Sequence, residues 1–397
     1  MANVFIARQP IFDRDLDVAG YELLFRGANE NVAIIADHDD ATSTVVMNAF
    51  TEIGLHNVVG ERRAWINVSR DFILAGLARA LPRGKVVLEL LEDQQLDDAL
   101  LEALDEHRAW GYPIALDDFD GKEEMLRALG HVDIVKVDVL GRDFSAIEHD
   151  YRRLAAHGVT LLAEKVETRE EYEHCLELGF DLFQGYFFCK PERMEARGVA
   201  PNRLSMLGLV AALQDPNIEI EQIEILVSRD VALSYRLLRY INSAFFGLRR
   251  EVDSINRALM LLGVANVKRW ATLSVFAGVD EKPRELIETA LVRARFCELA
   301  GEGNRDQLFT LGLFSVVDAL MDAPMEEVLA TMPFPEEMRE ALISLTGPKG
   351  ELLQAALSFE RGEFNPPLDR FATSYVAAMT WATDVADDLF GVRALAA

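Results

Sequence analysis

The chain has 397 residues, half of them hydrophobic, and a formal net charge of −26 at pH 7. This length allows roughly two to three domains of ~150 residues, each with a buried core. So negative a surface repels nucleic acid, which argues against generic DNA or RNA binding through a basic face.

The chain also lacks the signals of membrane insertion and export. No apolar run approaches the ~18–20 residues that cross a bilayer. The N-terminal segment reaches charged residues too early for a signal peptide. The three cysteines, Cys175, Cys189 and Cys297, match no zinc or CxxC spacing. We therefore expect a cytoplasmic protein without membrane association, whose cysteines are buried thiols in a reducing compartment.

Short β-like runs alternate with helical stretches up to about residue 190. The expected strands cover 4–10, 18–26, 64–69, 85–92, 112–119, 132–140, 159–167 and 180–188, and the turn-like DRDLD joins the first two. The expected helices cover 39–55, 70–81, 94–109, 122–129, 143–157 and 169–178. Strands that alternate with helices predict a parallel sheet with helical cover, and eight of them indicate a (β/α)8-type barrel.

The pattern changes after about residue 195, where strand signals vanish and helical periodicity takes over. In 231–245, for example, Leu233, Leu237, Leu238 and Ile241 fall on one helical face. Segments 254–278, 283–301 and 306–321 have the same character. The sequence thus predicts an α/β domain over 1–195 and an all-α domain over 196–397.

Acidic, amide and basic residues stand at or near the ends of most expected strands. They are Glu22, Asn67, Glu89, Glu92, Asp117, Asp118, Lys136, Glu164, Glu167 and Gln184. Any one of these acids could be a solvated loop residue. Acidic residues are unfavourable in strands, however, so their presence at most strand ends indicates that they converge on one site. Such oxygen ligands suit Mg²⁺ or Mn²⁺, and two metals ~4 Å apart can activate water and stabilise the leaving oxygen of a phosphodiester. Lys136 could orient that water, and Gln9 and Arg26 could hold substrate phosphates and bases.

Six motifs in order make residues ~1–192 resemble an EAL domain, the phosphodiesterase module for cyclic di-GMP. They are Glu22-Leu23-Leu24 with Arg26, Asn67, the ExxE pair Glu89 and Glu92, Asp117-Asp118-Phe119 followed by Lys136, AEKVET around Glu164, and Gln184-Gly185-Tyr186. The resemblance implies two-metal hydrolysis of cyclic di-GMP to linear pGpG. It implies that Glu22, Asn67, Glu89, Asp117 and Glu164 ligate the first metal.

The same resemblance implies roles for the remaining residues. Asp118 would help to hold a second metal, and Lys136 would position the nucleophilic water, so that Glu22, Asp117, Asp118 and Lys136 form the expected catalytic set. Gln9, Arg26 and Gln184 would contact the substrate. Glu92 would anchor a loop.

Two departures from the family bear on these expectations. After Phe119 the family continues Gly-Thr-Gly-Tyr-Ser-Ser, whereas this chain reads Asp120-Gly121-Lys122-Glu123-Glu124 and is about two residues short before Lys136. In the family this loop helps to complete the metal site and the dimer interface. The sequence therefore leaves open whether the domain turns over substrate and whether it forms an EAL-type homodimer. The glycine of the family's AEGVET is Lys165 here, and the sequence leaves the effect of this change open.

All seven histidines precede residue 200, so the helical half lacks the His ligands of an HD-type metal phosphohydrolase. Segment 202–247 nevertheless resembles an HDOD domain, an HD-like helical bundle without the metal site, and 254–273 and 359–364 extend the resemblance. It implies a signalling or regulatory module that binds an unidentified protein partner.

Three functional hypotheses follow. The first is an EAL–HDOD signalling protein that hydrolyses cyclic di-GMP. The second is a catalytically degenerate EAL domain that binds the nucleotide as a receptor. The third is a protein-interaction scaffold that acts through the helical half.

Overall fold

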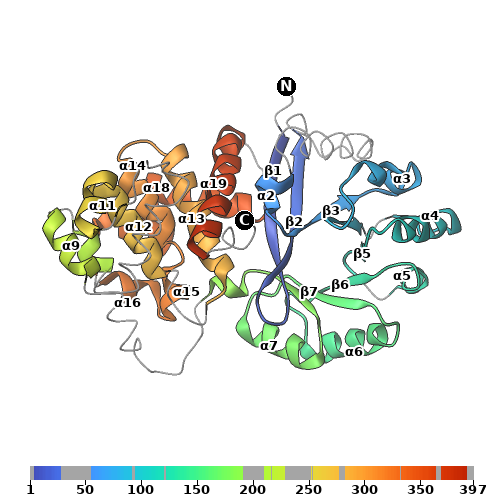
Figure 1. Ribbon diagram of the computed structural model, residues 1–397. Helices are drawn as coiled ribbons and strands as arrows, with labels where there is room; N and C mark the ends of the chain where they lie inside the picture. Colours follow the sequence, from blue (N-terminus) through green and yellow to red (C-terminus); the bar gives the residue numbers. More distant parts are fainter. Residues whose placement is uncertain are drawn as a thin grey trace. The chain divides into compact units, whose positions relative to one another are not determined.

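The computed structural model contains a closed eight-stranded barrel with strand order β1 to β8, followed in the chain by helices (Figure 1). The structure describes residues 4–27, 55–91, 94–119, 122–190, 210–215, 217–228, 252, 254–276, 282–330, 332–363 and 368–390. The chain forms two compact units: residues 1–188 with 357–376, and residues 189–356 with 377–397. The predicted combination of a (β/α)8-type barrel and an all-α region is confirmed, and the predicted boundary at residue 195 falls outside the described residues.

The barrel strands begin with a hairpin. β1 (Val4–Phe12) and β2 (Val18–Gly27) are antiparallel, and the Asp13 side chain accepts hydrogen bonds from the backbone N–H groups of Asp15 and Asp17 in the turn between them. The other strands are β3 (Arg63–Val68), β4 (Val86–Leu90), β5 (Ile114–Leu116), β6 (Ile134–Asp138), β7 (Thr160–Glu164) and β8 (Leu182–Gln184).

Neighbouring strands from β2 to β8 pair in parallel, but β1 is antiparallel to both β2 and β8. The predicted parallel sheet is therefore wrong for this one strand. The physical reason is the short turn after Phe12, because a tight turn can join only antiparallel strands and a parallel pair needs a longer crossover.

Helices connect the parallel strands around the barrel. They are α2 (Leu55–Val59), α3 (Arg70–Leu74), α4 (Asp98–Ala109), α5 (Glu123–Ala128), α6 (Phe144–Ala155) and α7 (Arg169–Leu178), with 3-10 turns at η1 (Leu77–Ala80) and η2 (Phe187–Cys189). The predicted helix over 70–81 is divided because Gly76 adopts a left-handed conformation with φ of 66°. The predicted helix over 39–55 falls outside the described residues except at Leu55.

One layer of apolar side chains fills the barrel interior. Its buried members are Ile11, Trp65, Val87, Ala115, Ile134 and Leu162, with Leu182 packed against them. β2 contributes Gly20, where an added Cβ would lie 2.7 Å from Trp65 Nε1 and 2.9 Å from the Arg63 carbonyl oxygen. The layer closes one end of the barrel, and Gly20 leaves the space that the indole of Trp65 occupies.

The described helices of the helical unit include α9 (Ile220–Ser228), α11 (Ile255–Leu262) and α12 (Val264–Phe276). These three helices share a buried core that includes Ile223, Leu259 and Trp270. The predicted helix over 254–278 divides at Gly263, which has φ of 76°. The predicted amphipathic helix over 231–245 lies outside the described residues.

The later helices are α13 (Arg284–Ala300), α14 (Arg305–Phe314), α15 (Val317–Met321), α16 (Met325–Ala330), α17 (Glu336–Ser344), α18 (Gly347–Glu360) and α19 (Ala372–Phe390), with a 3-10 turn at η4 (Leu368–Phe371). The segment predicted as one helix over 306–321 is two helices, because Ser315 ends α14.

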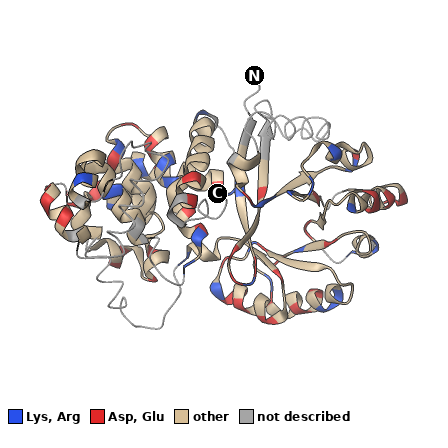
Figure 2. Cartoon of the chain, viewed as in Figure 1, with Lys and Arg blue, Asp and Glu red and all other residues tan. Residues whose placement is uncertain are grey.

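Much of the negative charge lies on the solvent side of helices. Figure 2 shows acidic residues in red along α4, and of these Asp98, Glu102, Asp105 and Glu106 are exposed. Within the described part of the chain, no helix is long and apolar enough to cross a membrane. All three cysteines are free thiols, and Cys175 and Cys297 are buried as predicted, whereas Cys189 is only partly buried.

Gly20→Ala tests the packing of the barrel interior. The added methyl group overlaps Trp65, so the free energy of unfolding should fall by ~1–3 kcal/mol, as for other overpacked cores. Denaturant titration of the full chain measures this change. Gly130→Ala is the matched control, because a Cβ there meets no atom within 4 Å, and its effect should stay within about 0.5 kcal/mol. Equal effects of the two substitutions would contradict this packing.

Candidate metal centre

Strand alternation brings the predicted site residues together inside the barrel. Seven of them lie two positions after Gly20 or after a residue of the apolar layer, on the same face of the strand. The pairs are Gly20 and Glu22, Trp65 and Asn67, Val87 and Glu89, Ala115 and Asp117, Ile134 and Lys136, Leu162 and Glu164, and Leu182 and Gln184. β1 runs in the opposite direction, so Gln9 precedes Ile11. The site therefore occupies the carboxyl-terminal end of the parallel strands, where barrel enzymes carry their chemistry.

The ammonium group of Lys136 lies among four carboxylates from four different strands. Its Nζ atom is 2.6 Å from Glu164 Oε1, 3.0 Å from Asp117 Oδ1 and 3.6 Å from Glu22 Oε2, and it also contacts Glu89 Oε1. The Lys136 side chain is only 1% exposed. One ammonium cannot balance four ionised carboxylates, so the cluster favours further positive charge or bound protons.

The pKa values of the cluster reflect this imbalance. Burial, and then the neighbouring charge of Glu22, raises the pKa of Glu89 well above its ordinary value. Burial also raises the pKa of Glu164 to about 8, although Lys136 acts in the opposite direction. Burial alone would lower the pKa of Lys136, but the carboxylates, led by Glu22, outweigh it and raise that pKa well above the ordinary value. A bound metal ion would act against the rise in the pKa values of Glu89 and Glu164, because it favours the ionised forms of the acids that it contacts.

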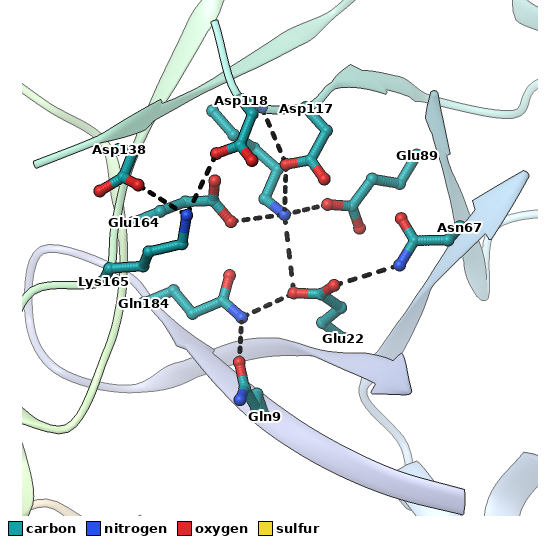
Figure 3. Close-up of polar contacts among 11 residues, drawn as sticks. Gln9, Glu22, Asn67, Glu89, Asp117, Asp118, Asp138, Glu164, Lys165 and Gln184 are labelled. Carbon is teal, nitrogen blue, oxygen red and sulfur yellow. Dashed lines mark hydrogen bonds and ion pairs between the residues drawn. The ribbon is translucent and has the colours of Figure 1, made fainter. Parts of the chain in front are cut away.

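Two amide side chains orient Glu22 (Figure 3). Asn67 Nδ2 donates a hydrogen bond to Glu22 Oε1 at 3.3 Å, and Gln184 Nε2 donates to Glu22 Oε2 at 2.7 Å. Gln184 Nε2 also donates to Gln9 Oε1 at 2.9 Å, and Gln9 Nε2 donates to the backbone carbonyl of Glu360 at 3.1 Å. The Gln184 amide nitrogen thus positions Glu22, a role that the sequence did not predict.

The donor atoms match the requirements of a divalent cation. Oxygen atoms of Glu22, Glu89 and Glu164 lie within 4.8 Å of one another, and so do those of Asp117, Asp118 and Glu164. Asn67 Oδ1 and Glu89 Oε2 are buried and accept no hydrogen bond within the described ranges. A buried oxygen without a partner is costly, and coordination to a metal would satisfy both atoms.

The helical unit differs from the barrel in its candidate metal ligands. In its described residues, no group of three or more His, Cys, Asp or Glu side chains could hold a metal.

A second group of charges lies beside the cluster and was not predicted. Lys165 Nζ is 2.6 Å from Asp138 Oδ2 and 3.4 Å from Asp118 Oδ1 (Figure 3). Partial burial favours the neutral amine of Lys165, but the hydrogen bond to Asp138 and the nearby acids raise its pKa above the ordinary value. One signal in the sequence was available, since Asp138 follows Lys136 by two positions at the end of the same strand.

Three of the predicted positions, Glu92, Arg26 and Glu167, are not among the side chains described at the site. Glu92 and residues 120–121 lie outside the described residues, and for Arg26 only the backbone, paired with Phe5, is described. Glu167 is exposed, and its backbone N–H donates to Glu171 Oε2 at the start of α7.

Glu164→Gln tests the protonation of the metal-free cluster. With an ordinary pKa of 4.5 and a folded-state value of about 8, the stability that Glu164 contributes is present below pH 4.5 and lost as the pH rises toward 8. Glutamine does not titrate, so the variant should gain on the order of 2 kcal/mol over the wild type between pH 4.5 and 8.5.

Denaturant unfolding in the presence of EDTA measures this difference. Glu170→Gln, an exposed position on α7, should show no such trend with pH. A difference between Glu164→Gln and the wild type that is independent of pH would contradict the raised pKa.

Comparison with known proteins identifies both halves of the chain. The EAL domain family model matches residues 2–191, and the HDOD domain family model matches residues 204–323. Over 97% of its length the chain is 33% identical to the cyclic di-GMP phosphodiesterase CdgJ of Vibrio cholerae, of which it covers 94%. It is 32% identical to the uncharacterized protein YuxH of Bacillus subtilis over 97% of this chain and 99% of that protein.

Two solved structures are also similar. The EAL domain of DcpA from Mycobacterium smegmatis is 26% identical, with a TM-score of 0.38 over 46% of this chain and 91% of that one. Klebsiella pneumoniae BlrP1, solved with calcium and cyclic di-GMP, is 25% identical, with a TM-score of 0.38 over 46% of this chain and 54% of that one. From the two family matches and the full-length relatives, the chain belongs to the family of two-domain EAL–HDOD proteins.

Proposed function

We propose that the barrel hydrolyses cyclic di-GMP to linear pGpG in a reaction that requires Mg²⁺ or Mn²⁺. The observation that carries this proposal is the convergence of Glu22, Glu89, Asp117 and Glu164 on the buried Lys136 ammonium. The name of the Vibrio cholerae relative, a cyclic di-GMP phosphodiesterase that aligns over nearly the whole chain, supports the choice of substrate.

The proposed ligands of the metal are the oxygen atoms that face Lys136 and the buried oxygens without partners. They are Glu22, Asn67, Glu89, Asp117 and Glu164, with Asp118 beside them. A bound metal supplies a Lewis acid for the phosphate and lowers the pKa of a coordinated water. Such an all-oxygen donor set is typical of Mg²⁺ and Mn²⁺.

Lys136 acts as a hydrogen-bond donor in this proposal. Its raised pKa keeps the ammonium protonated at neutral pH, so it cannot serve as the general base. Instead it orients the attacking water and offsets the negative charge that develops on the phosphate. The water oxygen forms a bond to phosphorus and the bond from phosphorus to the 3′ oxygen breaks. The proton that the water gives up ends on the departing 3′ oxygen, so no proton is gained or lost overall.

Gln184 and Asn67 act as positioning residues. They hold the two oxygens of Glu22 from opposite sides and so fix the carboxylate before substrate binds. Gln9 and Arg26 remain the proposed contacts to phosphate and base. Such preorganisation lowers the cost of assembling the charged transition state.

For the helical unit we propose a regulatory role through binding of a protein partner. The HDOD match and the absence of His, Cys, Asp or Glu metal groups in its described residues support this role over an enzymatic one. The three free thiols support a cytoplasmic location for this protein.

Glu89→Gln and Glu22→Ala should each reduce pGpG formation by at least ~100-fold, because losing a direct ligand costs more than losing a supporting residue. Chromatography of cyclic di-GMP incubated with the full chain and Mg²⁺ or Mn²⁺ measures the product. Glu61→Gln is the matched control, since Glu61 is exposed and pairs with Lys85. Wild-type protein that leaves cyclic di-GMP intact with both metals would contradict the proposal.

A receptor without turnover is the second candidate function. The observation in its favour is the departure from the EAL pattern after Phe119, where the chain continues Asp120-Gly121-Lys122. Calorimetry separates the two functions, because a receptor binds cyclic di-GMP and yields no pGpG. A chain that neither binds nor cleaves the nucleotide would favour a scaffold that acts through the helical unit.

A further inference from the structure

The Lys165 ammonium lies beside the second group of candidate metal ligands. That group consists of Asp117, Asp118 and Glu164. Lys165 Nζ approaches Asp118 to 3.4 Å, and Glu164 is the preceding residue in the chain. Figure 3 shows the Lys165 side chain reaching toward Asp118 from the side of Asp138. A cation in this group would therefore have to share Asp118 with an ammonium that is already there.

The backbone directs Lys165 toward the cluster. Lys165 has φ of 55°, in the left-handed region that a lysine seldom adopts. The residues on both sides of it are tied to neighbouring strands. The Glu164 carbonyl accepts a hydrogen bond from Val139 N at 3.1 Å, and Val166 N donates to the Gln184 carbonyl at 3.0 Å. These bonds maintain a conformation that would otherwise relax, and strained residues of this kind concentrate at functional sites.

Asp138 holds the ammonium in place. Its Oδ1 atom accepts a hydrogen bond from Leu140 N at 2.8 Å, and its Oδ2 atom lies 2.6 Å from Lys165 Nζ. The carboxylate is thus fixed by the backbone before it engages the lysine. Asp118 also has a left-handed backbone, with φ of 40°, so both partners of the Asp118–Lys165 contact are held in uncommon conformations.

We infer that Lys165 takes the place of a second divalent ion, so that this barrel binds one divalent metal per chain and Lys165 supplies the second positive charge. The inference rests on the proposed metal-dependent function of the same site. Two metals in a hydrolytic site lie ~4 Å apart and share bridging ligands. An ammonium held at Asp118 would repel a dication at that distance and would leave Asp118 already paired. Lys165 is accordingly a positioning and charge-balancing residue.

The alternative is that Lys165 swings away when a second ion arrives. Its side chain is 47% exposed, which leaves room for such a movement. The two cases differ in the number of ions that bind. They can be separated by counting ions, without reference to the rate of hydrolysis.

The experiment titrates the full chain with Mn²⁺ and counts free ions by electron paramagnetic resonance. We expect one Mn²⁺ per chain for the wild type and for Lys165→Arg, which keeps the charge. We expect two Mn²⁺ per chain for Lys165→Gln. The affinity for the second ion should be higher than in the wild type by roughly tenfold or more. Lys165→Gly should also bind two and relieves the backbone strain, so it separates loss of charge from misfolding.

Lys85→Gln is the matched control and should bind one ion. Lys85 has a similarly exposed side chain, at 42%, and pairs with Glu61 at 2.6 Å, away from the cluster. Two ions in the wild type, or one ion in both Lys165→Gln and Lys165→Gly, would overturn the inference. If the wild type binds one ion but forms no pGpG, the proposed function is contradicted and the inference about Lys165 is not. If the wild type binds no ion, the proposed function and the inference are both contradicted.

Discussion

Four carboxylates inside the barrel share one buried ammonium, and this imbalance of charge governs the rest of the site. Burying ionised acids is costly unless cations or hydrogen-bond donors compensate them. Lys136 compensates only part of the charge, and burial accordingly raises the pKa values of Glu89 and Glu164. A divalent cation is the compensation that the donor set suits best. Metal binding and stability of the barrel are therefore coupled.

The barrel tolerates this arrangement because one end of its interior is apolar and well packed. Along each strand the same inward face carries first an apolar side chain and then, two residues later, a site residue. The layer beneath the site excludes water and fixes the directions of the side chains above it. Gly20 makes the layer possible where Trp65 needs space. The residues that stabilise the barrel and the residues of the site thus lie two positions apart on the same strands.

Much of this site could be predicted from the sequence, because an acid within an apolar strand such as KVVLEL needs a structural reason. The position of these residues at strand ends predicted that they converge. The alternation of side chains along each strand predicted that they point into the barrel. The interruptions at Gly76 and Gly263 were harder to predict, since the periodicity of apolar residues continues across both. The antiparallel β1 followed from the short turn at 13–17, which the general pattern of alternating strands and helices obscured.

The contact of Lys165 with Asp118 and Asp138 could not be predicted, because it joins three strand ends whose spacing depends on barrel closure and register. The sequence showed only a lysine where related chains have glycine. The structure shows that the lysine contacts Asp118 and Asp138, and this contact is the basis for our proposal of one bound metal ion. In that proposal, Lys165 is part of how this barrel balances charge.

The most direct test of the account is a time course of pGpG formation by the purified full chain with cyclic di-GMP, with Mn²⁺ or Mg²⁺ and after their removal by EDTA. The account predicts product only in the presence of metal. Cyclic di-GMP that stays intact with a folded, metal-loaded protein would contradict it.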